Sequence, residues 1–129
     1  MLEERDRQLL RGRYHAQFVT LNADGTPHVT PVWVDADTEG HVVVNTAVGR
    51  RKERNVARDP RVAISVYAVE DPLTYVSVNG SVVGRIEEPD ALTHMDSLSL
   101  RYDGKAWTPV EGQQRVMLLI HPEHVLRGG

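Results

Sequence analysis

The sequence contains no cysteine. This absence excludes disulfides, thiolate metal sites, iron–sulfur clusters and catalysis by a thiol nucleophile. Long apolar segments are missing too, because no run approaches the roughly 18 apolar residues that a membrane-spanning helix needs. The first ten residues, MLEERDRQLL, are too charged for a secretory signal. We therefore expect a cytoplasmic protein with no membrane partner.

What the sequence does contain is typical of a soluble globular protein. Hydrophobic residues make up 40% of the 129 residues and charged residues 26%, which is the balance of an ordinary folded domain. We find no internal repeat, low-complexity tract or linker. A chain of this length fits one hydrophobic core, so we predict a single domain spanning residues 1–129.

Alternating and β-rich segments predict a mostly β fold. Six strands are expected, over about residues 14–22, 28–36, 41–46, 61–69, 74–88 and 114–126. The fifth is long enough to bend at Gly80 or Gly84. Short helices are expected near residues 2–11, between Gly49 and Pro60, and over about 14 residues before Gly104. This order predicts a six-stranded antiparallel barrel with two or three short helices.

Positive charge is concentrated in the predicted helix before Pro60. Residues 50–58 carry a balance of +4 in a chain of net charge −3, so the rest of the chain sums to −7. Arg50, Arg51 and Lys52 stand at the start of this helix, where basic residues oppose the helix dipole. A bound phosphate would compensate them, because the free N–H groups of a helix start bind anions. The alternative is a solvated charged face.

The segment HVTPVWV, residues 28–34, forms a second cluster. Pro31 lacks a backbone N–H and indicates an edge, a bulge or an opening in the sheet. Trp33 lies two residues further on, so that a flat apolar surface would stand beside an irregular backbone. The alternative for Trp33 is an ordinary core position.

Other kinds of site have little support in the sequence. The histidines fall at no metal-ligand spacing, except that His121 and His124 flank a Pro-Glu pair, and we expect no metal. No P-loop, dinucleotide fingerprint or nucleophile elbow is present. The acidic net charge argues against a nucleic-acid partner, because general nucleic-acid binding needs an extended basic surface.

The order of these features resembles a known family. A hairpin ending in GTPHVTPVWV, the strand HVVVNT, the helix GRRKERNVARDPRV and two further strands are similar to the pyridoxamine 5′-phosphate oxidase-like split β-barrel superfamily. The similarity covers about residues 10–121 and is greatest to the actinobacterial branch that uses the deazaflavin coenzyme F420. The resemblance implies a homodimer with two flavin-type cofactors at its interface.

The same resemblance implies roles for ten residues in cofactor binding. The phosphate would be held by Arg50, Arg51 and Lys52. Thr46 would place a hydroxyl near the ribityl chain, and Asn55 would support the same loop. The ring system would be lined by Val29, Thr30, Pro31, Val32 and Trp33. The partner chain would complete the site, with the loop around Trp107 as a candidate.

The expected activity is hydride transfer from reduced F420 to a conjugated small-molecule acceptor. Arg50, Arg54 and Arg58 are spaced four apart and would extend about 12 Å along one helix face, which suits the anionic tail of F420. An FMN-dependent oxidase or reductase of the same fold, and a non-catalytic flavin-binding or F420-binding protein, remain alternatives. The catalytic residues are not assigned, and the proton could come from water, His28 or Tyr75. Oxidation of the vitamin itself is not expected, because the longer C-terminal region of true pyridoxamine-phosphate oxidases has no counterpart here.

Overall fold

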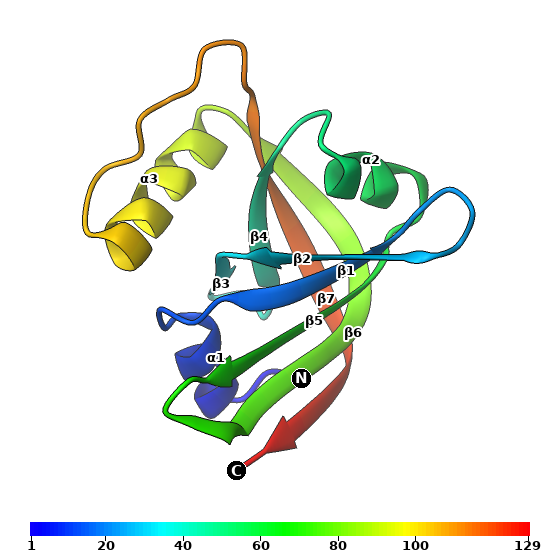
Figure 1. The fold of residues 1–129 in the computed structure, drawn as a ribbon, viewed down its shortest axis with the longest axis vertical. Coiled ribbons are helices and arrows are strands. Elements are labelled where there is room, and N and C mark those ends of the chain that lie inside the picture. Colours follow the sequence, from blue (N-terminus) through cyan, green and yellow to red (C-terminus); the bar gives the residue numbers. More distant parts are fainter.

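The computed structural model describes all 129 residues and contains a single antiparallel sheet of seven strands (Figure 1). Along the sheet the strands follow the order β2-β1-β5-β6-β7-β4-β3. Their bounds are β1 Ala16–Leu21, β2 Pro27–Val32, β3 Val34–Ala36, β4 Val42–Ala47, β5 Arg61–Ala68, β6 Asp71–Glu87 and β7 Arg115–Gly128. The helices are α1 Glu4–Leu10, α2 Arg51–Arg58 and α3 Asp90–Asp103.

The prediction of six strands is wrong, because the predicted strand over residues 28–36 is two strands. They meet at Trp33 and lie at opposite edges of the sheet, where β2 pairs with β1 and β3 pairs with β4. Pro31, which has no N–H to donate, stands just before this change of partner. A chain that passes from one edge to the other within one residue curls the sheet into a half-barrel. The alternation of side chains continues across Trp33, so the pattern alone did not reveal the break.

The long strand β6 bends where its glycines are. Its register against β7 shifts between Asn79 and Gly80 and again between Val82 and Gly84. A Cβ atom at Gly80 would lie 2.1 Å from the carbonyl oxygen of His121, a distance that only glycine avoids. The predicted bend is therefore confirmed, and the close approach at Gly80 explains why it needs glycine.

The core fills the inside of the curled sheet. One cluster of 19 buried hydrophobic residues includes Phe18, Leu118 and Ile120, all fully buried. Helix α1 packs against β3, β5 and β6 at one end of the barrel, near both termini. Helices α2 and α3 lie apart from each other at the other end (Figure 1). None of the three helices is long and apolar enough to cross a membrane.

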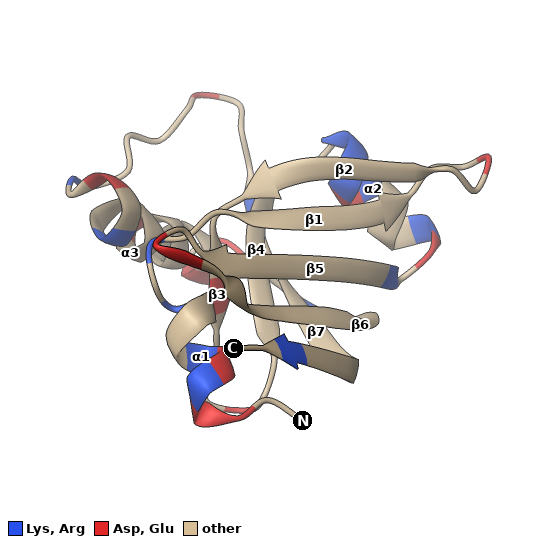
Figure 2. Ribbon diagram, turned by 60° about the horizontal axis from the view of Figure 1, so that its bottom comes forward, with Lys and Arg blue, Asp and Glu red and all other residues tan.

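The outer face of the sheet carries no charged side chain across its middle. Figure 2 shows β2, β1, β5 and β6 side by side with acidic and basic residues only near the strand ends. Cross-strand pairing and the alternating burial pattern place nine uncharged residues on this face: Gln17, Val19, Val29, Ala63, Ser65, Tyr67, Tyr75, Ser77 and Asn79. In a chain with 26% charged residues, this face therefore stands out by its lack of charge.

Candidate functional site

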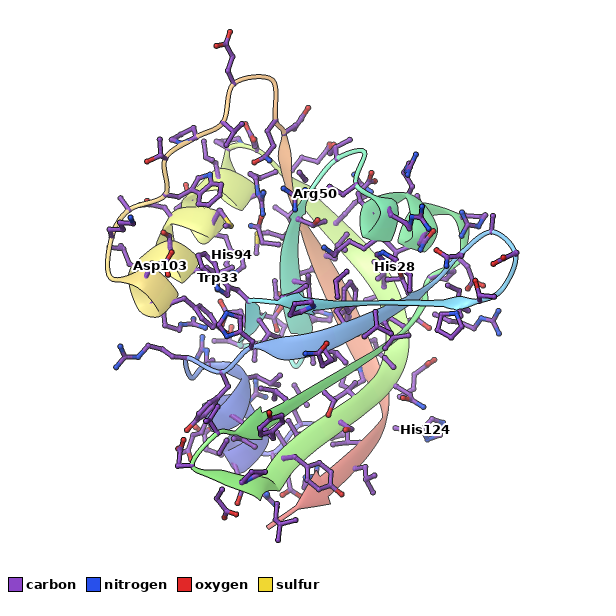
Figure 3. All side chains as sticks on the ribbon, viewed as in Figure 1. His28, Trp33, Arg50, His94, Asp103 and His124 are labelled. Carbon is purple, nitrogen blue, oxygen red and sulfur yellow. The ribbon has the colours of Figure 1, made fainter.

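A cavity of about 290 Å³ opens between the loop before α2, helix α3 and the break between β2 and β3. Figure 3 places Trp33 beside α3 and Arg50 at the loop that precedes α2, on different sides of this space. Twelve residues line it: His15, Pro31, Val32, Trp33, Asn45, Thr46, Arg50, Lys52, Met95, Leu98, Trp107 and Arg115. The lining therefore combines aromatic and apolar groups with three cations.

The loop before α2 leaves the first N–H groups of the helix without hydrogen-bond acceptors. Gly49 has φ +93°, a value that favours glycine, and its N–H donates to Glu53 Oε1 at 2.7 Å. Arg50 is the N-cap residue, and no side chain caps the helix. The N–H groups of Arg51, Lys52 and Glu53 consequently have no acceptor within the protein. Open amides at a helix start form a site for an anion.

Three cations converge on the cavity without a carboxylate to pair with. Arg50, Lys52 and Arg115 all line it, and none of them forms a salt bridge, although other arginines of the chain do. Burial lowers the pKa of the Lys52 ammonium, and the charges of Arg50 and Arg115 lower it further. Burial, together with the charge of Arg50, lowers the pKa of Arg115 to about 10, although the charge of Glu88 acts in the opposite direction. The site is thus a concentration of positive charge near which Glu88 is the one carboxylate, and Glu88 accepts a hydrogen bond from the backbone N–H of Arg115 at 2.8 Å rather than from its guanidinium.

Arg115, at the first position of β7, is the most informative of the three. Its side chain is buried, with 5% of the residue exposed, and its polar partners are all neutral. Nε donates to Asn45 Oδ1 at 2.9 Å, Nη1 to Gln113 Oε1 at 3.0 Å, and Nη2 lies 3.3 Å from Met95 Sδ. The guanidinium also lies 5.4 Å from the centre of the Trp107 ring. A buried charge is normally paired, so an anionic ligand is expected to supply the missing partner.

The aromatic side of the cavity is held rigidly. The Trp33 ring stacks on Tyr102 with centroids 5.0 Å apart and planes 10° apart. The Tyr102 hydroxyl donates to the Tyr14 carbonyl at 2.8 Å and accepts from the Val34 N–H at 3.1 Å. His15 meets the edge of the same tyrosine. The indole plane of Trp33 is thereby fixed in the cavity wall, as a planar ligand requires.

Six of the ten residues expected to bind the cofactor line this cavity, namely Pro31, Val32, Trp33, Thr46, Arg50 and Lys52. Val29 is 54% exposed on the outer face of the sheet. Thr30 points to the inner side of β2, where its Oγ1 is buried without a hydrogen-bond partner. Arg51 and Asn55 line a different cavity.

This second cavity, of about 480 Å³, lies between α2 and the turn after β1. Its lining residues are Asn22, Ala23, Asp24, Arg51, Arg54, Asn55 and Arg58. Asn55 is buried and donates to Thr20 Oγ1 and Asn22 Oδ1, so it joins α2 to β1. The expected row of Arg50, Arg54 and Arg58 is changed, because Arg50 precedes the helix and Arg51 takes its place.

Several lining residues escaped the sequence analysis. Asn45, Met95 and Arg115 come from three different elements, and only the fold brings them together. Trp107 lines the cavity of its own chain, whereas its loop was expected to act from a partner chain. His28 and Tyr75, the two expected proton sources, are absent from the lining, and His15 is the histidine that the cavity contains.

The one group of side chains with the spacing of a metal site lies elsewhere. Ligand atoms of Asp37, Glu39 and His41 lie within 4.8 Å of one another in the turn between β3 and β4. Asp37 accepts hydrogen bonds from the N–H groups of Glu39 and His41 and from the His41 ring. These contacts account for the cluster as a hydrogen-bonded turn.

The fold and cavity agree with the family that the sequence matches. The sequence model of the pyridoxamine 5′-phosphate oxidase family matches residues 2–127, so the chain belongs to this family, and the resemblance seen in the sequence is confirmed. No curated protein matches the chain in sequence.

Solved structures with the same fold include one described as an F420 reductase, which is 28% identical and has a TM-score of 0.84. The match covers 97% of this chain and 98% of that one. A conserved hypothetical protein from Mycobacterium tuberculosis is 26% identical over 97% of this chain and 82% of its own, with a TM-score of 0.76. General Stress Protein 26 from Bacillus anthracis is 17% identical over 97% and 92% of the two chains, with a TM-score of 0.72, and shows the fold alone.

Proposed function

We propose that the protein is an F420-dependent reductase that binds the deazaflavin in the cavity lined by Trp33 and Arg115. Membership of the pyridoxamine 5′-phosphate oxidase family supports the general class, an oxidoreductase with a flavin-type cofactor. The similarity to an F420 reductase supports the choice of cofactor. The observation that carries the proposal is the buried, unpaired Arg115 beside Lys52 and Arg50.

The donors in the cavity suit a phosphate group attached to a planar ring. The open N–H groups at the start of α2, with Lys52 and Arg115, would hold the phosphate through charge-assisted hydrogen bonds. Trp33, fixed by its stack on Tyr102, would pack against the ring system. The Nε1 of Trp107 is buried without a partner and offers one further donor.

A second copy of the chain would complete the site. A cavity of about 290 Å³ lies at the lower limit of pockets that enclose a drug-sized ligand, about 300 to 1,000 Å³. The uncharged outer face of the sheet supports a homodimer. Two copies of a chain with net charge −3 repel each other least through a face that carries no charge.

The second cavity would hold the anionic tail of F420. Arg51, Arg54 and Arg58 follow one face of α2 over about 10 Å. They form no salt bridge, although Arg58 Nη2 donates to the Leu21 carbonyl at 2.6 Å. FMN ends at its phosphate and would leave these arginines unused, so they favour the deazaflavin.

When bound, reduced deazaflavin would supply the hydride that a conjugated acceptor receives. The protein would bind the cofactor through Arg50, Lys52 and Arg115 and would fix the plane of the ring through Trp33. The acceptor also needs a proton, and His15 is the histidine that lines the cavity. An FMN-dependent enzyme would use the same phosphate site, and a non-catalytic binding protein would hold the cofactor without turnover.

The decisive test is oxidation of reduced F420 in the presence of a panel of conjugated acceptors, followed by cofactor absorbance. Acceptor-dependent oxidation would establish the reductase. Tight binding without oxidation by any acceptor would point to the non-catalytic alternative. The deazaflavin nucleoside, which lacks phosphate and tail, serves as the control ligand and should bind at least about tenfold more weakly.

A further inference from the structure

A line of hydrogen bonds leads from the cavity back into the protein. Asn45, on β4, accepts from Arg115 Nε at 2.9 Å through its Oδ1. Its Nδ2 lies 3.1 Å from Nδ1 of His94, on α3. The other ring nitrogen of His94, Nε2, lies 2.9 Å from Oδ2 of Asp35, on β3. Figure 3 shows His94 between α3 and the strands, and it does not line the cavity itself.

The groups around Asn45 fix the orientation of its amide. Nδ2 also donates to the Ala91 carbonyl at 2.8 Å. A carbonyl can only accept, and the Nε of Arg115 can only donate. Turning the amide over would oppose like groups at both Ala91 and Arg115. The Asn45 N–H therefore faces His94, whose Nδ1 must be the acceptor, and the ring proton sits on Nε2 and points to Asp35.

The carboxylate of Asp35 accepts the hydrogen bond from this Nε2–H group. Burial opposes its ionisation, but the hydrogen bond from His94 and the charge of Arg101 outweigh burial and hold its pKa below the usual range. Arg101 Nη2 lies 3.0 Å and Arg11 Nε 3.7 Å from Asp35 Oδ1. The charges around His94 are thus the Asp35 carboxylate with these two cations behind it, and Arg115 beyond Asn45.

We infer that His94 is a positioning residue for Arg115. In its neutral form, with the proton on Nε2, it keeps the Asn45 oxygen on Arg115 and so keeps the guanidinium directed at the cavity. A proton added to Nδ1 would meet the Asn45 N–H, break this contact and release Arg115. Anion binding is therefore coupled to the protonation of His94, a residue that touches no ligand. The identity of the ligand rests on the proposed function, whereas the alignment of Arg115 does not.

Two substitutions at His94 distinguish a role in positioning Arg115 from a role in filling space. In His94→Gln the amide oxygen accepts from Asn45 and the amide nitrogen donates to Asp35, and this side chain does not titrate. In His94→Leu both contacts are lost. With F420 as the probe, or FMN where F420 does not bind, His94→Gln should stay within about twofold of the wild-type affinity and His94→Leu should lose about tenfold or more. Circular dichroism checks that both variants fold.

A ligand-free measurement tests the coupling directly. Long-range proton–nitrogen NMR spectra report which ring nitrogen of His94 carries the proton, and the Arg115 Nε–H signal reports its environment. On acidification from about pH 8 to about pH 5.5, the Arg115 signal should shift with the midpoint of His94 in the wild type. It should stay constant in His94→Gln, whose F420 affinity should also lose the part of its pH dependence that follows the protonation of His94.

Three results would overturn the inference. They are a proton on Nδ1 of His94 at neutral pH, an Arg115 Nε–H signal that does not change when His94 is protonated, and wild-type affinity in a folded His94→Leu protein. If the protonation of His94 does not change over this pH range, the inference is tested by whether His94→Leu loses affinity for the probe. If neither F420 nor FMN binds, the proposed function fails, while the ring proton and the Arg115 signal of His94→Leu still decide this inference.

Discussion

At the scale of single residues, the site is defined by charges that the folded protein does not pair. Burying a guanidinium among neutral partners costs free energy that a hydrophobic side chain of similar size would not. Arg115 carries this cost, and the pKa values of Lys52 and Arg115 are lowered first by burial and then by the charge of Arg50. A bound anion would relieve both effects.

The first prediction follows from this balance. Arg115→Met should weaken F420 binding by more than about tenfold, because a charge-assisted contact of about 1.5 to 3 kcal/mol is lost. The free energy of unfolding should change by less than about 1 kcal/mol, since the desolvation cost of the charge disappears while the Asn45 oxygen loses its donor. Fluorescence quenching and urea denaturation measure the two effects. Arg61→Met, at an exposed arginine paired with Asp59, is the control and should bind like the wild type.

The second prediction concerns Lys52. Lys52→Ala should weaken F420 binding by more than about tenfold, whereas Lys105→Ala, at an exposed lysine, should have no effect. Because the pKa of Lys52 lies below its ordinary value of 10.5, the ammonium is lost as pH rises through this lowered pKa. As the pH is raised, the affinity of the wild type for F420 should therefore begin to fall before the pH reaches 10.5. Lys52→Arg should keep its affinity over the same pH range. Equal affinity in Lys52→Ala and the wild type would remove Lys52 from the site.

The sequence could reveal some of these residues and not others. Arg50, Arg51 and Lys52 are neighbours in the chain at a place where their charge opposes the helix dipole, so the anomaly is visible without a structure. Arg115 is a single arginine at the start of an apolar strand, and the absence of a salt bridge to its guanidinium depends on which side chains the fold brings near it. Its role could not be read from local pattern.

At the scale of elements, the two features that shape the site are interruptions of regular strands. The break at Trp33 separates β2 from β3 and places the indole in the cavity wall. The bends of β6 let one strand serve two parts of the curled sheet. Glycine positions in the sequence predicted the second feature. The first depends on a change of pairing partner, which alternation of side chains does not record.

A third prediction tests the close approach in β6. Gly80→Ala should lower the free energy of unfolding by about 2 kcal/mol or more, because its Cβ would lie 2.1 Å from the backbone carbonyl oxygen of His121. Gly84→Ala is the matched control, since its Cβ would lie 3.4 Å from the flexible side chain of Leu119, and it should cost much less. Urea denaturation compares the two. Similar losses in both variants would show that the bend does not depend on the contact at Gly80.

At the scale of the whole molecule, the small volume of the cavity and the lack of charge on the outer sheet face have a common interpretation. A cavity too small to enclose a complete cofactor and a face without charge would both be explained by the homodimer proposed above. The alternation of polar and apolar residues in the sequence predicts which side chains of each strand point outwards. The breadth of the uncharged face emerges only from the strand order β2-β1-β5-β6.

The fourth prediction is that Val29→Glu produces a monomer. Val29 lies on the outer face of β2, and a carboxylate there would be buried against a second acidic chain. Val69→Glu, in the exposed turn after β5, is the matched control and should remain a dimer. Light scattering at micromolar concentration distinguishes the two states. A wild-type protein that is monomeric under these conditions would contradict the dimer.

A side-by-side titration of the purified protein with F420 and with FMN, following the fluorescence of each ligand, would show which cofactor the cavity around Arg115 binds. We predict that F420 binds preferentially, at micromolar concentration or below, and that Arg51, Arg54 and Arg58 contribute to the preference. Preferential binding of FMN would assign the cavity to a flavin enzyme and return these arginines to ordinary surface charge. Binding of neither ligand would contradict the assignment of the cavity around Arg115 as a flavin-type cofactor site.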